Sequence, residues 1–213
     1  KATYMMQSNL NTSFTGDDNL YIRLKTGNAT DWQKDYKYGT YLSSSKGNGD
    51  QVKVDKIWYS FPLGDHTFWI GPKIENYYMH GTTPSIYKPV LKQFTLGGNG
   101  AAYGASTSPG LGWAYKADNG FAISSNFATK DGHTTTGMLT KEGDTSWATQ
   151  IGYTKPTYSA SIILNQKYNG WEDSYYTTPL GKARADLDST NIGFRTWGRP
   201  DDAGTAVPSL SLG

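Results

Sequence analysis

Apolar and polar side chains alternate with a period of two residues along most of this chain. The alternation is clearest in residues 20–25, 68–73, 111–116, 121–127, 147–153, 158–165 and 191–195. Such alternation is typical of β-strands that present one apolar and one polar face. With a first strand expected over residues 3–15 and a last one over residues 207–212, the pattern predicts an all-β protein of about ten strands.

Short and long connections follow each other between these segments. The short ones contain residues that favour tight turns: Gly16-Asp17-Asp18, Pro62-Leu63-Gly64-Asp65, Ala117-Asp118-Asn119-Gly120, Lys155-Pro156 and Pro200-Asp201-Asp202. The long ones cover about residues 27–50, 75–110, 129–146 and 167–189. Short turns at one rim and long loops at the other are typical of transmembrane barrels, so the spacing predicts an antiparallel up-and-down transmembrane β-barrel.

The alternation breaks once, within residues 51–61. Val52 and Val54 share one face, whereas Ile57, Tyr59 and Phe61 continue that face one residue late. A β-bulge adds one residue to a strand in this way. The sequence therefore predicts a bulge near Lys56.

Aromatic residues gather beside the short turns. The residues concerned are Phe14, Tyr59, Phe61, Phe68, Tyr115, Phe121, Tyr153 and Tyr158. Rings at one height along a barrel form the girdle that lies at the membrane–water interface. The alternative is that aromatic residues simply favour strand ends in hairpin proteins of any kind.

The polar faces of the predicted strands carry most of their charged side chains. These are Arg23, Lys25, Lys53, Asp55, Lys73, Lys116 and Arg195. In a barrel this face lines water, and we expect these residues to line a pore; in a soluble sandwich the same face would meet solvent. The excess of basic side chains predicts a weak preference for anions or neutral polar solutes.

Composition narrows the chemistry. The 213 residues include no cysteine, and 20 basic side chains nearly balance 18 acidic ones, which does not indicate a nucleic-acid partner. No apolar run reaches the roughly 18 residues of a transmembrane helix. His66, His80 and His133 lack metal-ligand spacing and are interpreted as exposed polar residues. We therefore expect no metal, no cofactor and no catalytic residues, and a protein that is not an enzyme.

Four segments resemble a known family. They are residues 9–16 (NLNTSFTG), 20–28 (LYIRLKTGN), 54–65 (VDKIWYSFPLGD) and 96–101 (LGGNGA). Together they resemble cyanobacterial outer-membrane porins, which are related to carbohydrate-selective porins and include iron-uptake porins. The resemblance is specific within residues 8–125 and vague from residue 130 onward.

The resemblance implies a barrel larger than this chain. Residues 1–213 would be one porin domain, incomplete at both ends, of a barrel of about 16 strands. Family members also carry an N-terminal surface-layer-homology domain that binds peptidoglycan, and this chain would reach peptidoglycan only through that missing domain. By analogy with general porins, a homotrimer is expected.

The resemblance also implies a role for residues 75–110. In porins of this kind the third long loop folds into the lumen and narrows it. Pro84, Pro89 and Pro109 are expected to stop regular strands there, and residues 97–100 to pack tightly against the wall. Lys73 is expected near this constriction, to which Glu75, Lys88 and Lys92 of the loop would contribute. The alternative is a solvated surface loop with ordinary charges.

Two functions follow as hypotheses. The first is a passive diffusion channel for small hydrophilic solutes and inorganic ions in the outer membrane of a Gram-negative-type, cyanobacterial cell. If lumen aromatics such as Tyr21 and Trp69 form a continuous surface in such a channel, carbohydrates could also pass. The second is a soluble β-sandwich that binds carbohydrate through grouped aromatic residues.

Overall fold

A computed structural model of the protein describes residues 2–29, 33, 41–85, 89–92, 94, 96, 100–104, 107–138, 140, 142–168, 189–198 and 211–212. Strands dominate this part of the chain. They are β1 (Met5–Thr12), β2 (Asn19–Gly27), β3 (Lys53–Leu63), β4 (His66–Glu75), β5 (Thr107–Lys116), β6 (Phe121–Thr129), β7 (Thr145–Thr154), β8 (Tyr158–Tyr168), β9 (Ser189–Gly198) and β10 (Ser211–Leu212). The two named helices are short: the 3-10 helix η2 (Asn76–Met79) and α1 (Gly100–Tyr103).

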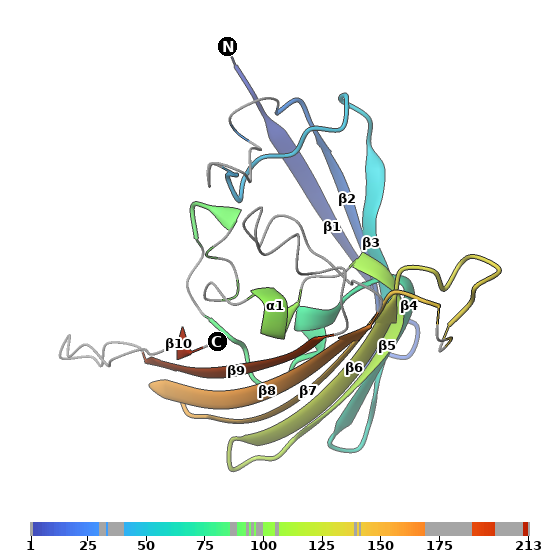
Figure 1. The fold of residues 1–213 in the computed structure, drawn as a ribbon. Helices are drawn as coiled ribbons and strands as arrows, with labels where there is room; N and C mark the ends of the chain where they lie inside the picture. Colours follow the sequence, from blue (N-terminus) through green and yellow to red (C-terminus); the bar gives the residue numbers. More distant parts are fainter. Residues whose placement is uncertain are drawn as a thin grey trace.

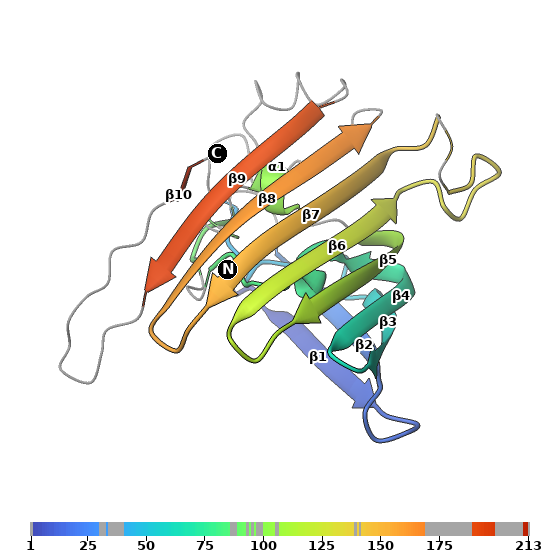
Figure 2. The same cartoon turned by 90° about the horizontal axis from the view of Figure 1, so that it is seen from below.

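All ten strands belong to one sheet, and each strand pairs with its neighbours in the sequence. The order runs from β1 to β10 without a crossover, and the pairs are antiparallel (Figures 1 and 2). The predicted all-β, up-and-down arrangement is therefore confirmed. Within the described residues β1 pairs only with β2 and β10 only with β9, so the sheet is open there. Closure into a barrel stays a prediction.

The connections alternate in length as predicted, with different boundaries. The short ones cover residues 13–18, 64–65, 117–120 and 155–157, and long ones cover residues 28–52, 76–106 and 130–144. The turn at Pro200 and the loop expected over residues 167–189 lie almost wholly outside the described residues.

The two terminal strands differ in extent from the prediction. The first strand covers Met5–Thr12, so its predicted bounds of 3–15 were too wide at both ends. At its end Ser13 and Thr15 leave the strand because their hydroxyl groups donate hydrogen bonds to the Asp18 carboxylate. Of the predicted last strand, only Ser211–Leu212 are described.

The predicted bulge is present. Arg23 of β2 lies opposite Lys56 and Leu24 lies opposite Val54, which leaves Asp55 as the extra residue of β3. A second irregularity contradicts a prediction, because Pro109 lies inside β5 instead of ending a strand. It is tolerated there because the register between β4 and β5 shifts at this point, so Pro109 has no ladder partner on β4.

The sheet is curved, and the exposed large apolar side chains of β5–β9 lie on the convex face. Leu111, Trp147, Ile162 and Ile192 are each between 49% and 58% exposed. Their sequence neighbours point to the concave face, where α1 and the chain around η2 also lie (Figure 1). Apart from Ile163, these neighbours are small or polar, and Gly112, Ala148 and Ser161 among them are buried. The usual distribution of a soluble protein, apolar inside and polar outside, is thus reversed in this wall.

Two small hydrophobic clusters form where residues 76–104 meet the concave face. In the first cluster, Met79 packs with Tyr21, Trp58, Ile74, Ala128 and the half-buried Trp69. Leu96, Ala102 and Tyr103 join the second, with Ala148, Ile163 and the half-buried Tyr77. We call the described residues between 76 and 104 the inward segment. Its burial against the sheet covers the polar face beneath it, where Ser124, Asn126 and Gln150 are buried.

Candidate functional site

The concave face has two regions of different chemistry. The charged region lies on β2–β4 and the loop before β3, and consists of Arg23, Lys25, Lys46, Asp55, Lys56 and Glu75. The neutral region lies on β6–β8, and consists of Ser124, Asn126, Gln150, Ser161 and Asn165. Both contact the inward segment or the residue that precedes it.

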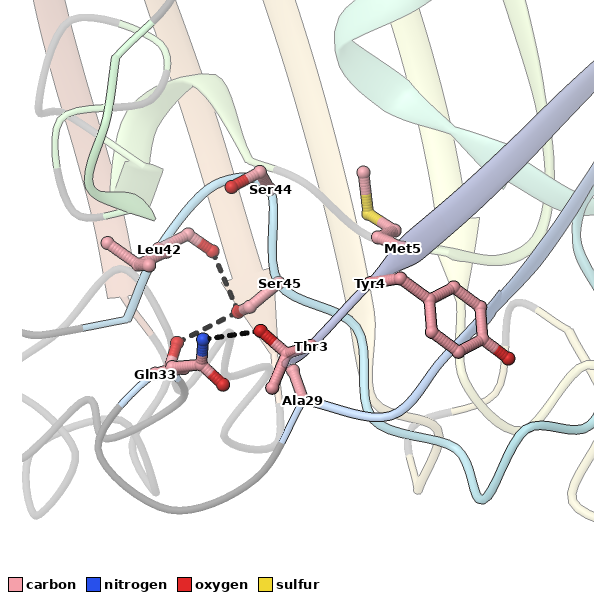
Figure 3. A pocket seen from close by; sticks show the side chains of 8 residues that line it. All are labelled: Thr3, Tyr4, Met5, Ala29, Gln33, Leu42, Ser44 and Ser45. Atoms are coloured by element: carbon pink, nitrogen blue, oxygen red, sulfur yellow. Dashed lines mark hydrogen bonds between the residues drawn. The ribbon is translucent and has the colours of Figure 1, made fainter. Parts of the chain in front are cut away.

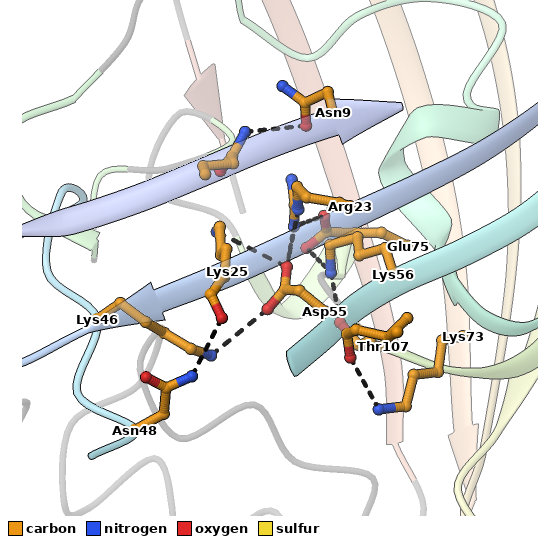
Figure 4. A network of polar contacts seen from close by, with 12 residues as sticks. Asn9, Arg23, Lys25, Lys46, Asn48, Asp55, Lys56, Lys73, Glu75 and Thr107 are labelled. Carbon is orange, nitrogen blue, oxygen red and sulfur yellow. Dashed lines mark hydrogen bonds and ion pairs between the residues drawn. The ribbon is translucent and has the colours of Figure 1, made fainter. Parts of the chain in front are cut away.

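In the charged region, ion pairs connect three strands. One guanidinium nitrogen of Arg23 lies 2.7 Å from Asp55 Oδ2 and 3.1 Å from Glu75 Oε2, while Lys56 Nζ lies 2.8 Å from Glu75 Oε1 (Figure 4). The bulge makes this possible, because it turns both Asp55 and its neighbour Lys56 toward the concave face. Since the side chains of Arg23 and Lys56 are almost fully buried, these pairs fix the start of the inward segment.

Positive charge remains in excess after this pairing. Lys46 Nζ lies 3.4 Å from Asp55 Oδ1, and Lys25 Nζ lies 3.7 Å from Asp55 Oδ2. Asp55 therefore pairs with three cations, and the region holds four cationic side chains but only two carboxylates. The Lys46 side chain is 34% exposed, so part of this charge faces water. Such an arrangement attracts anions.

Aromatic rings adjoin the charged region. The Tyr21 and Trp58 rings lie 4.3 Å apart, and Tyr78 of η2 lies 5.1 Å from Trp58 and accepts a hydrogen bond from Arg23. Tyr21 is buried, and Trp69 is half-buried against the same cluster. Tyr21, predicted as a free lumen aromatic, is thus covered by side chains of its own chain.

In the neutral region, side-chain amides bind the backbone of the inward segment. Gln150 accepts a hydrogen bond from Thr82 N at 3.0 Å and donates one to Thr82 O at 2.9 Å. Asn165 Nδ2 donates to Ala102 O at 3.0 Å. Ser124 Oγ accepts from Gly81 N at 2.8 Å. These contacts satisfy backbone groups that would otherwise be buried without partners.

Glycines let the inward segment lie close to the strands. A Cβ at Gly112 would lie 2.5 Å from Met79 Sδ, and one at Gly152 would overlap Thr82. A Cβ at Gly193 would lie 3.0 Å from the Tyr103 ring. The small residues of the polar face are therefore explained by this contact, which the alternation alone did not predict.

His80 differs from its predicted environment. It was expected to be exposed, yet it is buried: its Nε2 lies 3.0 Å from Tyr103 O and its Nδ1 lies 3.3 Å from Asn126 Nδ2. Burial lowers the pKa of His80 to about 4, and the hydrogen bond to the Tyr103 carbonyl offsets part of that effect. His133 is exposed, as expected, and half-buried His66 accepts a hydrogen bond from Trp113 Nε1.

The structure brings together four of the predicted site residues, namely Arg23, Lys25, Asp55 and Glu75. Glu75 was expected to face the constriction, but its carboxylate is engaged by Arg23 and Lys56. None of these placements tests a role in a pore.

The other predicted site residues lie apart from this group. Lys53 and Lys116 are exposed, and exposed Lys73 donates to Val54 O at 3.1 Å. Lys92 N donates to Tyr41 O, and its ammonium group lies 5.4 Å from the Tyr41 ring centre. Lys88 and the side chain of Arg195 lie outside the described part of the chain.

Sequence reasoning missed several members of the site. Lys56 had a usable signal, because the predicted bulge implies that two consecutive residues share a face. Lys46 and Tyr78 had none, since both come from connections whose path the alternation does not fix. Gln150 and Asn165 had no signal either, because their partners are backbone atoms far away in the sequence.

A small pocket lies beside the beginning of β1. It has a volume of about 240 Å³ and is lined by polar side chains such as Thr3, Gln33 and Ser45 and by apolar ones such as Met5 and Leu42 (Figure 3). Gln33 Nε2 donates to Thr3 Oγ1 at 2.7 Å, and Ser45 Oγ donates to Gln33 O. These bonds attach the first long loop to β1 and bring no charged group into the pocket.

Among the described residues, no group of three or more His, Cys, Asp or Glu side chains is placed to hold a metal ion. No helix in the same part of the chain is long and apolar enough to cross a membrane.

Comparison with protein-family models, with curated proteins and with solved structures finds no match to this chain. The resemblance to outer-membrane porins therefore stays a prediction.

Proposed function

We propose that this protein is an outer-membrane diffusion channel. The observation that carries the proposal is the reversal of the two faces of the sheet: large apolar side chains are exposed on the convex face, while polar and glycine positions are covered on the concave face. Water penalises an apolar outer face of this kind, whereas lipid stabilises it. The convex face would therefore contact outer-membrane lipid.

A membrane location requires closure of the sheet. Each unpaired backbone group in lipid costs several kcal/mol, so the free edge of β1 would need a further strand beside it. The resemblance to cyanobacterial porins implies a barrel of about 16 strands in a cyanobacterial outer membrane, of which this chain would form part. Analogy with general porins adds a homotrimer. Aromatic residues near the short turns, such as exposed Phe14 and Phe121, support an interfacial girdle at that rim.

Transport through such a barrel is passive. The inward segment occupies the concave side and would narrow the water-filled lumen, as expected for residues 75–110. The charged region adjoins it with four cations against two carboxylates, which supports a weak preference for anions or neutral polar solutes. No catalytic group, metal or cofactor has a part in this function.

The alternative was a soluble carbohydrate-binding β-sandwich. A sandwich packs two sheets face to face, whereas the described strands all belong to one sheet. The aromatic cluster that might bind a sugar, around Tyr21 and Trp58, is covered by Tyr78. No observation favours this alternative over the channel.

The test is conductance in a planar bilayer, run on the full-length protein with its complete barrel, refolded in detergent. We expect stepwise ion currents and a reversal potential in a salt gradient that indicates a mild preference for anions. Lys46→Glu should shift the reversal potential toward cation preference. Lys155→Glu, the same charge change at a short turn outside the concave face, should leave it unchanged. A protein that remains soluble without detergent and carries no current, or one with clear cation selectivity, would overturn the proposal.

A further inference from the structure

His80 connects the two arms of the inward segment to the sheet. It follows η2, on the arm that leaves β4, and its Nε2 lies 3.0 Å from the carbonyl oxygen of Tyr103 on the returning arm. Its Nδ1 lies 3.3 Å from Asn126 Nδ2 on β6. The ring also contacts the Tyr103 ring edge-on, with centroids 5.9 Å apart. A single imidazole thus has contacts with both arms and with the wall.

These contacts require the neutral imidazole. Because Tyr103 O can only accept, Nε2 carries the hydrogen, and Nδ1 is left to accept from Asn126 Nδ2. A proton added to Nδ1 would face Asn126 Nδ2, which is itself a hydrogen-bond donor. Asn126 Oδ1, which could accept it after rotation of the amide, is buried and has no hydrogen-bond partner at present. Protonation therefore forces Asn126 to rotate or His80 to move.

Within the described part of the chain, no counter-charge faces His80. Along β6 no residue is ionisable, and on β7 the ionisable side chain is that of Tyr153. From α1 it meets the neutral Tyr103, and on β5 the charged residue is the exposed Lys116 at the strand end. Glu75, at the end of β4 just before η2, forms ion pairs with Arg23 and Lys56. An imidazolium here would be buried without a counter-charge among these residues, which is costly.

We infer that His80 is an acid-sensitive switch: its neutral ring holds the inward segment against β6–β8, and its protonation releases that segment from the sheet. Release would widen the lumen, and this consequence rests on the proposed channel function. The release itself does not rest on it.

The size of the effect follows from linkage. The pKa of His80 is about 4 while the segment is bound, because of burial, and returns to its ordinary value near 6.5 once the ring meets water. The equilibrium constant for release should therefore rise on the order of 100-fold between pH 7 and pH 4. The bonds from Gln150 and Asn165 to the segment do not titrate, so they set the fraction released at neutral pH.

The absence of cysteine allows a direct measurement with single introduced thiols. Ser161→Cys places a nearly isosteric thiol on β8, where the site is 5% exposed and lies under Tyr103. Ser44→Cys, at an exposed loop position, serves as the reference. A pyridyl disulfide reagent, which reacts in acid, is applied to both in detergent. We expect the rate at Ser161→Cys, relative to the reference, to rise at least tenfold from pH 7 to pH 4.

Histidine variants assign that rise to one residue. In His80→Gln, whose amide still donates to Tyr103 O but does not titrate, the rise should disappear. In His133→Gln, a matched change at an exposed position, it should persist. A rise of equal size in His80→Gln, or no rise in the parent protein, would overturn the inference.

A second variant decides the matter should His80→Gln fail to fold. Asn126→Asp offers the imidazolium an acceptor in the bound state, so the acid-induced rise should shrink several-fold; an unchanged rise would again count against the switch. Conductance is recorded separately and should increase in acid unless His80 is replaced. Acid-dependent labelling without any current would refute the channel and leave the switch standing.

Discussion

The charged and neutral regions of the concave face fix the same segment by different means. In the charged region, Arg23 and Lys56 pair with Glu75, the last residue before the inward segment begins. In the neutral region, Gln150 and Asn165 bind the segment's backbone directly. Carboxamides can be buried completely once both of their ends are bonded, whereas ions keep a desolvation cost even when paired.

This difference explains where the inward segment lies. It covers β6–β8 closely because those strands present glycine, alanine and neutral polar side chains. Over β2 and β3 the chain leaves Lys25 and Lys46 partly open to water, since covering them would remove hydration from charges that share one carboxylate. Side-chain charge thus determines which part of the wall is packed and which part stays wet.

The largest expected effect is loss of the central cation. Arg23→Met leaves Asp55 and Glu75 facing each other in a mostly buried site, and we expect the free energy of unfolding to fall by about 3 kcal/mol. Urea unfolding of the refolded protein in detergent measures it. Lys73→Met is the control, because Lys73 is exposed and should cost less than about 0.5 kcal/mol. Equal losses in the two variants would show that the charged region is not held by pairing.

A somewhat smaller effect is expected from the neutral region. Gln150→Leu keeps the volume but leaves Thr82 N and Thr82 O buried without partners, so the free energy of unfolding should fall by about 2 kcal/mol. Thr149→Val, on the same strand but on the convex face, should be nearly neutral. If Gln150→Leu proves harmless, the amide contacts do not hold the segment, and the contrast between the regions fails.

The sequence predicts the strands far better than it predicts the site. Alternation identifies the sheet and even the bulge beside Lys56, because those signals lie within a few residues of one another. The partners of Gln150 and Asn165 are backbone atoms 68 and 63 residues away in the sequence, which no local pattern marks. His80 was misjudged for the same reason: its burial depends on Tyr103 and Asn126, which join it only when the segment folds inward.

The next prediction concerns Gly152 of β7, which Thr82 of the inward segment approaches closely. A Cβ there would overlap Thr82 of the inward segment, so Gly152→Ala should cost about 1–2 kcal/mol by forcing the segment outward. Adding Thr82→Gly removes the colliding side chain, and the double variant should recover part of the loss. Urea unfolding of the single and double variants gives the coupling between the two sites. No recovery would mean that the strand itself, instead of the contact with the segment, is disturbed.

The smallest expected effect is the change in the cost of a substitution between pH 7 and pH 5. It distinguishes acid sensitivity of the neutral region from a loss of stability of the whole sheet in acid. Asp18, in the turn between β1 and β2, accepts hydrogen bonds from Ser13, Thr15 and Tyr59. These bonds hold the pKa of its carboxyl group far below the ordinary value. A carboxyl group lowered in this way contributes stability above its unfolded pKa of about 3.9, and this stability is lost only as the pH falls toward the folded value.

The buried His80 also loses its contribution as the pH falls, but in a higher window, because folding favours its neutral form: stability is lost as the pH falls from about 6.5 toward 4. The cost of Asp18→Asn should therefore be equal at pH 7 and pH 5, whereas the difference between His80→Gln and the parent protein should change over that interval. Urea unfolding at both pH values measures the two differences. If the cost of Asp18→Asn also changes between pH 7 and pH 5, acid weakens the sheet as a whole, and a distinct acid response of the neutral region is not needed to explain it.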